Sequence, residues 1–249
     1  MHRFSAAFFD LGGTLVYRIV TQERVLRLLC EEMELALPPE TDWQGAVAVW
    51  RAYHASHALS CRTLDSEQSL IRREAQLVLK SLTGGNASPT VVDRFHDGIR
   101  RSGRWWSVYD DVMPVLNYVK ATGLTTGVIS NWEPSLPDFV REMGLSHAFP
   151  VIVGSVEEGI EKPSPRLFEL AMERAGVNPA DALYVGDNYR SDVVGARAAG
   201  MTPVLLDRND RYLSTDCLKV RALDEVIDIL QGEFNSAALS EVCFSGFAL

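Results

Sequence analysis

Four polar residues each follow a short apolar run, and together they could bind and attack a phosphate group. Asp10 follows the run AAFF, and Ser130 ends the run TTGVIS. Lys162 lies in the loop EEGIEKPSP after a third run, and Asp187 follows a fourth within ALYVGD. A carboxylate can form a covalent bond to a transferred group, while a hydroxyl and an ammonium donate hydrogen bonds to phosphate oxygens. The set therefore predicts phosphoryl chemistry.

The acids of this set also predict a divalent cation. Asp10 and Asp187 come from neighbouring strand ends, so their carboxylates would repel each other without a cation between them, and Asp192 follows five residues later. Sites built only from oxygen ligands suit Mg²⁺. A carboxylate, Mg²⁺ and a phosphate group together permit covalent catalysis through an aspartyl-phosphate. We therefore expect Mg²⁺ as cofactor and a small phosphorylated metabolite as substrate.

Alternating strand and helix patterns position these residues. Near-continuous apolar runs predict buried strands, and amphipathic runs between the later strands predict helices. The strands are expected at 6–9, 126–129, 151–153, 182–185 and 203–206, and the helices at 112–121, 136–143, 165–175 and 191–199. This order predicts an α/β fold with a parallel sheet covered on both faces. Open parallel sheets bind ligands at the carboxyl ends of their strands, where the four polar residues lie.

The stretch between the first two strands has a different pattern. Strand signals are absent, and four helical patterns follow one another; Ser88 followed by proline is a suitable start for the last. We therefore predict a four-helix domain at 18–105, inserted into a core formed by 1–17 plus 106–232. The tail 233–249 has weak periodicity and no assigned role.

The four segments resemble the motifs of the haloacid dehalogenase-like hydrolase superfamily. In chain order they are DLGGTLV, VISNW, EKPSPRLF and YVGDNYRSDVVGARAAGM. The last is the most specific, because Gly186-Asp187, Asp192 and the small residues at 195–200 are typical of it. The helical insert lies where this superfamily carries its helical cap. The resemblance implies a Rossmann-like, doubly wound core and a cap that closes over the site.

The resemblance also implies roles for individual residues. The expected metal ligands are Asp10, the carbonyl of Gly12, Asp187, and Asp192 either directly or through water. The expected phosphate ligands are Ser130, the backbone N–H groups around Asn131, and Lys162. Asp10 and Lys162 are expected to take part in catalysis, with Asp10 as the nucleophile.

Gly12 stands where phosphatases of the superfamily carry a second aspartate. That aspartate protonates the leaving alcohol and then activates water, and glycine can do neither. Losing a positioned proton donor lowers the rate by about 10²–10⁴, or roughly 3–5 kcal/mol of barrier. The loss matters most for poor leaving groups. We therefore expect slow hydrolysis of alkyl phosphates and a smaller effect on acyl or aryl phosphates.

Three interpretations remain open. The first is a Mg²⁺-dependent phosphohydrolase, either slow on alkyl esters or supplied with an acid by His54 or His57 of the insert. The second is a metal-independent 2-haloacid dehalogenase, a branch that also lacks the second aspartate but carries a larger side chain there. The third is a phosphometabolite-binding protein with little turnover. Retention of Asp187 and Asp192 favours metal and phosphate, and therefore the first interpretation.

Two junctions join the insert to the core. Trp105 and Trp106 lie at the second junction, where hinge packing is the simpler prediction and a substrate-facing ring is the alternative. Tyr17 and Arg18 lead from the first motif toward the insert. We expect them to form a solvated linker, with substrate contact as the alternative.

Composition excludes several other classes of protein. The net charge is −9 and the sequence has no basic block, which argues against nucleic acid and anionic membranes as partners. No apolar run approaches the roughly 18 residues of a membrane helix, and no secretory signal is recognisable. The cysteines are scattered and form neither a zinc pattern nor a disulfide frame: Cys30, Cys61, Cys217 and Cys243. We expect a cytoplasmic monomer or homodimer.

Overall fold

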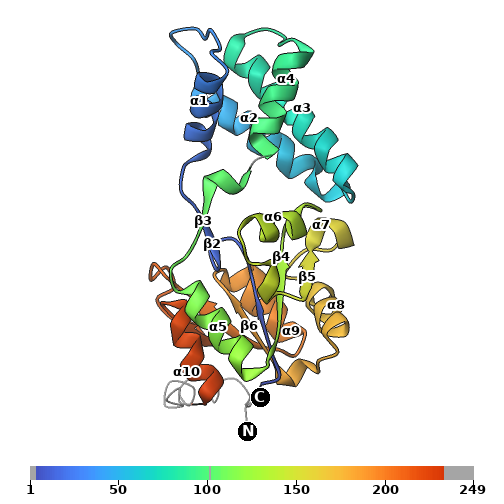
Figure 1. Cartoon of the computed structure of the whole chain (residues 1–249), viewed down its shortest axis with the longest axis vertical. Helices are drawn as coiled ribbons and strands as arrows, with labels where there is room; N and C mark the ends of the chain where they lie inside the picture. The colour runs from blue at the N-terminus through green and yellow to red at the C-terminus, as the bar shows by residue number, and fades with distance from the viewer. Residues whose placement is uncertain (1–3, 101, 233–249) are drawn as a thin grey trace, which may run out of the picture.

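The computed structural model describes residues 4–100 and 102–232, so the tail 233–249 lies outside the described residues. The described chain forms two units, a sheet flanked by helices and a group of four helices, which a two-stranded ribbon connects (Figure 1). None of the described helices combines the length and the apolar character that crossing a membrane requires.

The sheet has six parallel strands in the order β5-β4-β1-β6-β7-β8. The strands are β1 (Ala6–Phe9), β4 (Thr125–Ser130), β5 (Val151–Gly154), β6 (Ala182–Gly186), β7 (Thr202–Leu206) and β8 (Leu218–Val220). The five strands expected from the sequence are confirmed, and β8 was missed because Lys219 interrupts its apolar residues. β1 lies between β4 and β6, and β5 lies beside β4, so the four strands that lead into the motifs are adjacent in the sheet.

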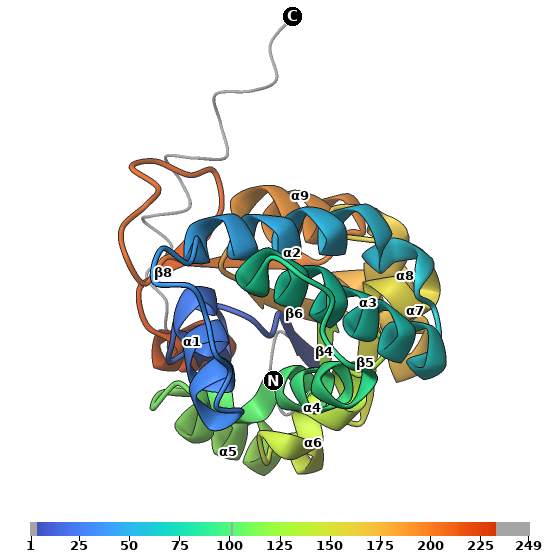
Figure 2. The same ribbon diagram turned by 90° about the horizontal axis from the view of Figure 1, so that it is seen from above.

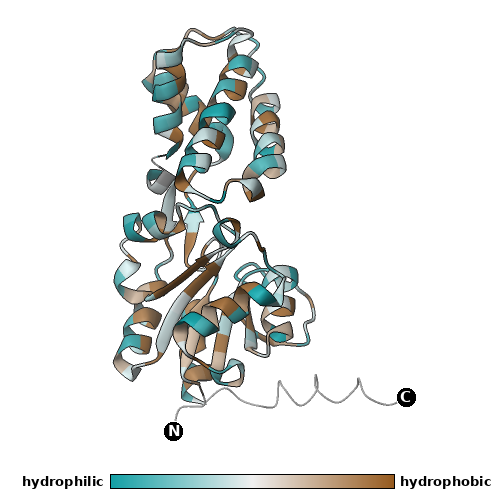
Figure 3. Ribbon diagram, turned by 90° about the vertical axis from the view of Figure 1, so that its right-hand side faces the viewer, coloured by the Kyte–Doolittle hydropathy of each residue, from teal (hydrophilic) through white to brown (hydrophobic). Residues whose placement is uncertain are grey.

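Both faces of the sheet are covered, as the apolar strands predict. Along β1, Ala7 and Phe9 pack into one core and Ala6 and Phe8 into the other, because successive side chains point to opposite faces. The first core is covered by α5 (Val112–Thr122), α6 (Leu136–Glu142) and α10 (Val226–Gln231). The second is covered by α8 (Pro165–Ala175) and α9 (Val194–Ala198). Figure 3 shows apolar strands inside and polar outer helix surfaces. The prediction of a doubly wound α/β fold is confirmed.

The four expected helices of the insert are present and have a core of their own. They are α1 (Gln22–Glu32), α2 (Trp43–His57), α3 (Leu64–Thr83) and α4 (Pro89–Arg100). Leu26, Leu79 and Phe95 are among their fully buried side chains, in a cluster separate from the two cores of the sheet. We call these four helices the cap, because seen from above they lie over the sheet unit (Figure 2).

An antiparallel ribbon connects the cap to the sheet, and no pattern in the sequence predicted it. β2 (Val16–Arg18) pairs with β3 (Trp106–Val108), so that Arg18 lies opposite Trp106. One further short helix, α7 (Ser155–Glu158), follows β5. Both junctions expected from the sequence therefore lie side by side in space.

Candidate active site

The motif residues meet at the carboxyl edge of the sheet, where Asp10 accepts two hydrogen bonds on one oxygen. Ser130 Oγ donates to Asp10 Oδ1 at 3.0 Å, and Lys162 Nζ donates to the same oxygen at 2.7 Å. Ser130 ends β4, next to β1, while Lys162 lies between α7 and α8. All three side chains are buried. The structure therefore brings the expected nucleophile and two of the expected phosphate ligands together.

Lys162 is a buried cation held between carboxylates. Besides Asp10, its ammonium contacts Asp192 Oδ1 at 2.6 Å and the hydroxyl of Tyr184 at 3.0 Å. Burial alone would lower the pKa of Lys162, but the charges of Asp10 and Asp192 outweigh burial, and the pKa is raised. Lys162 is therefore charged at neutral pH and can meet phosphate oxygens as a cation.

Asn131 fixes the backbone of Lys162. Its side-chain carbonyl accepts from the Lys162 N–H at 2.7 Å, and its side-chain amide donates to the Lys162 carbonyl at 3.1 Å. Both ends of the amide are thereby used. The Asn131 side chain positions Lys162, and the contribution of the backbone around Asn131 to phosphate binding stays a prediction.

Tyr184 is a site residue that the sequence analysis missed. Its hydroxyl, fully buried on β6, donates to the Ile129 carbonyl at 3.0 Å and lies 3.2 Å from Asp192 Oδ1. Burial, and after it the charges of Asp192 and Asp10, raise the pKa of Tyr184 well above its ordinary value, so the hydroxyl keeps its proton. The available signal was a lone hydroxyl within an apolar strand, because buried tyrosines usually have a hydrogen-bond partner.

The carboxylates form a cluster that suits a divalent cation. One oxygen from each of Asp10, Asp187 and Asp192 lies within 4.8 Å of the others. Burial raises the pKa of Asp10 to about 6 despite the opposing charge of Lys162. Mg²⁺ would relieve the crowding of these carboxylate oxygens.

The individual acids differ in how much of their hydrogen-bonding capacity is used. Lys162 occupies one Asp192 oxygen, and the Asn188 N–H donates to the other at 2.9 Å. This favours the water-mediated role among the two expected for Asp192. Arg211, which no motif marked, donates to Asp187 Oδ2 at 2.9 Å; burial raises the pKa of Asp187 and this arginine opposes the rise.

The two glycines after Asp10 have different reasons to be glycine. Gly13 has φ +86°, and a Cβ there would lie 2.7 Å from Asp187 Oδ2, so a side chain is excluded. Gly12 is outside the left-handed region, and its Cβ would lie 3.7 Å from Trp132 Cζ3 and 3.9 Å from Trp106 Cη2. Those are ordinary contacts. Backbone conformation and adjacent space therefore do not account for the missing acid at Gly12.

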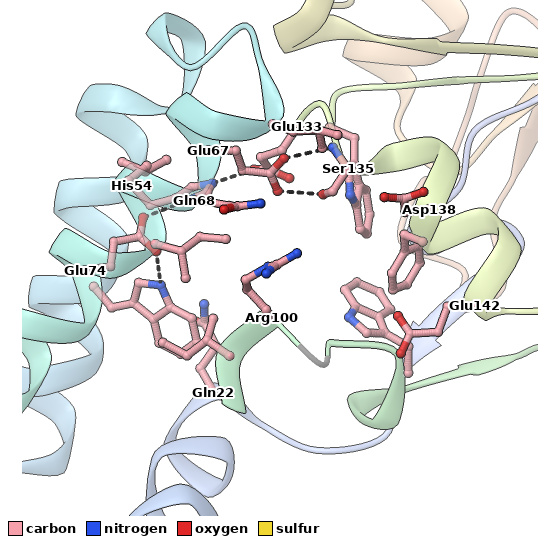
Figure 4. A pocket seen from close by; sticks show the side chains of 18 of the residues that line it. Gln22, His54, Glu67, Gln68, Glu74, Arg100, Glu133, Ser135, Asp138 and Glu142 are labelled. Atoms are coloured by element: carbon pink, nitrogen blue, oxygen red, sulfur yellow. Dashed lines mark hydrogen bonds and ion pairs between the residues drawn. The ribbon is translucent and has the colours of Figure 1, made fainter. Parts of the chain in front are cut away.

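A cavity of about 810 Å³ lies between the cap and the sheet unit. Asn131 and Trp132 line it next to the motif residues, and Figure 4 shows cap side chains on the opposite wall. Trp132 also packs against the rings of Trp106 and Phe139, with centroids 5.6 Å and 4.8 Å away. Trp106 and Trp132 line the cavity and also flank Gly12, so this part of the cavity lies close to the first motif.

The two candidate histidines lie in different environments. His54 lines the cavity, with Nδ1 2.9 Å from Glu74 and Nε2 2.7 Å from Glu133. These two partners raise the pKa of His54 to about 10. His57 is exposed, does not line the cavity, and its Nδ1 contacts the carbonyl of Tyr53 at 2.9 Å. The geometry therefore gives no support to His57 as a replacement acid, and both nitrogens of His54 are already engaged.

Some residues of the two junctions pack in a core, and others line the cavity. Trp105 is buried in the core of the cap, whereas Trp106 lines the cavity. Hinge packing thus describes Trp105 and a cavity-facing ring describes Trp106. Arg18 is exposed, as expected of a solvated segment, and it also lines the cavity, where the ribbon holds it opposite Trp106.

Comparison with known proteins agrees with this geometry. A family model described as haloacid dehalogenase-like hydrolase matches residues 4–200. The chain belongs to the haloacid dehalogenase-like hydrolase family. The resemblance found in the four motifs is thereby confirmed, and the match extends from β1 through the cap to the end of the fourth motif.

Curated relatives of this haloacid dehalogenase-like hydrolase include named phosphatases. A phosphoserine phosphatase of Thermus thermophilus is 35% identical over 136 residues, which is 53% of each chain. A glyceraldehyde 3-phosphate phosphatase of Methanopyrus kandleri is 37% identical over 106 residues, 40% of this chain and 43% of that one. Haloacid dehalogenase-like hydrolase domain-containing protein 3 of Danio rerio is 37% identical over 105 residues, 42% and 43% of the two chains. These matches span about half or less of each relative's length.

Solved structures of the family share the fold over nearly the whole chain. A 2-haloacid dehalogenase from Pseudomonas syringae aligns with a TM-score of 0.68 and 22% identity, covering 92% of this chain and 99% of that one. A phosphatase of the family from Thermococcus onnurineus aligns with a TM-score of 0.59 and 24% identity over the same shares. At such identities the similarity shows the fold alone, and it confirms the Rossmann-like core.

Proposed function

We propose that this hydrolase removes phosphate from small phosphorylated metabolites through an aspartyl-phosphate at Asp10. The observation that carries the proposal is the convergence of Ser130, Lys162 and the other two carboxylates on a buried Asp10 at the carboxyl edge of the sheet. The phosphatase names of the relatives from Thermus thermophilus and Methanopyrus kandleri support the same class of substrate.

One carboxylate oxygen of Asp10 is free to act as the nucleophile. Oδ1 accepts from Ser130 and Lys162, whereas Oδ2 accepts no hydrogen bond from the residues that the structure describes. Oδ2 attacks phosphorus, the bond from phosphorus to the leaving oxygen breaks, and its electron pair departs with the leaving group. A water molecule then attacks the phosphorus and loses a proton to the solvent, and the bond to Asp10 breaks to release inorganic phosphate and restore the carboxylate.

Mg²⁺ is the proposed cofactor, and it would be held by Asp10, the Gly12 carbonyl and Asp187, with Asp192 contributing through water. When bound, Mg²⁺ neutralises negative charge on the phosphate and on the surrounding carboxylates. Lys162, held between Asp10 and Asp192, supplies a further positive charge. Together the chain's own donors orient the phosphate group for attack.

The identity of the leaving group decides how fast the first step is. With glycine at position 12, no residue at that position protonates the leaving oxygen, so the group departs as an anion. Acyl and aryl groups tolerate this, and alkyl alkoxides do not. The preferred substrates are therefore phosphates with good leaving groups, unless a substrate brings its own proton donor.

Phosphate release by the Asp10→Asn protein tests the proposal. With acetyl phosphate and Mg²⁺, we expect a rate loss of at least about 10³-fold, as for loss of a covalent nucleophile. Rapid acid quenching should recover phosphate bound to the parent protein and none bound to the variant. Asp110→Asn is the matched control, because Asp110 is exposed and makes no described hydrogen bond or ion pair.

The alternatives give different outcomes in the same experiment. If the Asp10→Asn variant releases phosphate as fast as the parent, the covalent mechanism is wrong. Chloride release from a 2-haloacid in the presence of a chelator would favour the metal-independent dehalogenase. Tight binding of phosphorylated ligands by the parent, with no release from any ester, would favour the binding protein.

A further inference from the structure

Arg18 is a cation at the cavity that forms no ion pair with the described residues, although the charge of Glu133 acts on it. It lines the cavity from β2, and among the described residues none forms an ion pair or hydrogen bond with its guanidinium. Its Cζ lies 4.5 Å from the centroid of the Trp106 ring, which holds the group by a cation–π contact. Arg18 and Trp106 are also direct partners in the ribbon, so the backbone fixes their relative position.

Trp106 connects this arginine to the reaction centre. One edge of the ring approaches the Cβ position of Gly12 to 3.9 Å, and the guanidinium of Arg18 lies over the ring. A substrate whose phosphate sits at Asp10 must extend its leaving group past Gly12 into the cavity. The far end of the leaving group then lies near Arg18, at a distance of about one aromatic ring from Gly12.

The carboxylates that line the cavity mostly have other partners, unlike the guanidinium of Arg18. Four of the five carboxylates in the lining already have partners: Glu67 accepts from Ser135, Glu74 and Glu133 contact His54, and Asp138 pairs with Arg141. The fifth, Glu142, packs against Gly103. The acids of the cavity are thus largely occupied.

The arginines of the cavity are mostly free. Arg51 contacts only Gln22 among the described residues, through a hydrogen bond of 2.5 Å. Arg100, which has no described ion pair, extends toward the middle of the cavity in Figure 4. Arg18 and Arg51 also line a second hollow of about 480 Å³ next to the cavity. In a protein of net charge −9, this local excess of unpaired guanidinium groups requires an explanation.

We propose that Arg18, with Arg51 beside it, binds a second anionic group on the far end of the substrate. The substrate class is then a phosphate ester whose leaving group carries a carboxylate or another phosphate, because the planar fork of a guanidinium matches both groups. The aromatic wall of Trp106, Trp132 and Phe139 contacts the part between the two anions. This inference rests on the proposed phosphohydrolase function.

A matched pair of aryl phosphates tests the inference. In 4-carboxyphenyl phosphate and 4-carbamoylphenyl phosphate the leaving groups have similar size, and only the first has the second charge. We expect the parent protein to prefer the carboxylate ester by about tenfold to a hundredfold in kcat/KM, through a lower KM, as for a charge-assisted hydrogen bond. A third ester, 1,4-phenylene bisphosphate, distinguishes a carboxylate from a second phosphate.

The variant Arg18→Gln should reduce the preference for the carboxylate ester to about threefold or less by raising its KM, with a smaller change for the carbamoyl ester. Arg94→Gln is the matched control, because Arg94 is exposed on α4, has no described ion pair and does not line the cavity. Retention of the parent's preference in both Arg18→Gln and the Arg18→Gln/Arg51→Gln double variant would overturn the inference. Equal kcat/KM for the two esters in the parent would also overturn it.

Binding measurements separate this inference from the proposed function. Calorimetry on the Asp10→Asn protein gives the Kd of both esters without turnover. A tenfold tighter Kd for the carboxylate ester that depends on Arg18 supports the inference even if no ester is hydrolysed, in which case only the phosphohydrolase proposal fails. Equal Kd values together with normal hydrolysis by the parent would refute the role of Arg18 alone.

Discussion

At the scale of single residues, the hydroxyl of Tyr184 controls how Lys162 is held. The hydroxyl is the one neutral partner among the three groups that the described contacts place around the Lys162 ammonium, beside Asp10 and Asp192. It also ties this cluster to the backbone of β4 through the Ile129 carbonyl. Removing it would leave a buried carbonyl without its donor and the ammonium with one partner fewer.

The variant Tyr184→Phe should therefore lower the free energy of unfolding by about 1–3 kcal/mol, the usual effect of unpairing buried hydrogen-bonding groups. Urea denaturation measures the change. Tyr118→Phe is the control, because Tyr118 is a partly buried ring against the sheet core whose hydroxyl has no described partner. That control should change stability by less than about 0.5 kcal/mol. Equal losses in both variants would show that the Tyr184 hydroxyl has no special role.

Single residues also show what the sequence could and could not predict. Asp10, Ser130, Lys162 and Asp187 were predictable because each follows an apolar strand, and parallel strands bring such positions to one edge. Their mutual hydrogen bonds confirm the juxtaposition for Asp10, Ser130 and Lys162. Arg211 escaped because it lies in a loop 24 residues after Asp187, its partner, and no local pattern encodes that contact.

At the scale of elements, side-chain contacts at three places join the cap to the sheet unit among the described residues. His54 on α2 contacts Glu133, which follows β4, and Glu67 on α3 accepts from Ser135 before α6. Arg62, just before α3, donates to backbone carbonyls of α7 at the other side of the cavity. The first of these contacts depends on the charge of a histidine and therefore on pH.

The pKa of His54 is raised to about 10 from an ordinary 6.5, so its contribution to the free energy of unfolding decreases as pH rises. A group with a higher pKa in the folded protein stabilises it fully below the unfolded value and loses that effect as pH rises through the folded value. We therefore expect the difference in unfolding free energy between the parent and His54→Gln to be largest just below pH 6.5 and to vanish by about pH 10. Urea denaturation across this range measures it.

An exposed histidine provides the control for this pH dependence. His147 makes no described side-chain contact, so His147→Gln should differ little from the parent at any pH in the range. A difference for His54→Gln that stays constant from pH 6.5 to 10 would mean that its contacts with Glu74 and Glu133 do not depend on charge.

The elements themselves were predictable where a pattern repeats. The five predicted strands are near-continuous apolar runs, and the helices of the cap have amphipathic patterns or clear start signals, such as Thr21 capping α1 through the Arg24 N–H. The segment after β6 deviates, because a π-helical turn at Tyr189–Val193 precedes α9. This turn folds Asp192 back so that its carboxylate reaches the Asn188 N–H. Such a local change of helix type leaves the apolar pattern unaltered and was therefore invisible in the sequence.

At the scale of the whole molecule, the two units have separate tasks. The sheet unit carries the motif residues, and the cap supplies one wall of the cavity, which lies between the two (Figures 1 and 4). The ribbon pairs Arg18 with Trp106, and the ring of Trp106 lies next to Gly12. The central claim is that the centre is an intact phosphohydrolase site that lacks one proton donor.

Restoring an acid at position 12 tests that claim most directly. Phosphate release in the presence of Mg²⁺ is measured from acetyl phosphate and from glycerol phosphate, for the parent, Gly12→Asp and the isosteric control Gly12→Asn. The space beside Gly12 accepts a side chain, so both variants should fold. We predict that the parent cleaves the acyl phosphate, and that Gly12→Asp alone gains on the alkyl phosphate by about 10²–10⁴-fold. No gain by Gly12→Asp on the alkyl phosphate, or an equal gain by Gly12→Asn, would contradict the account.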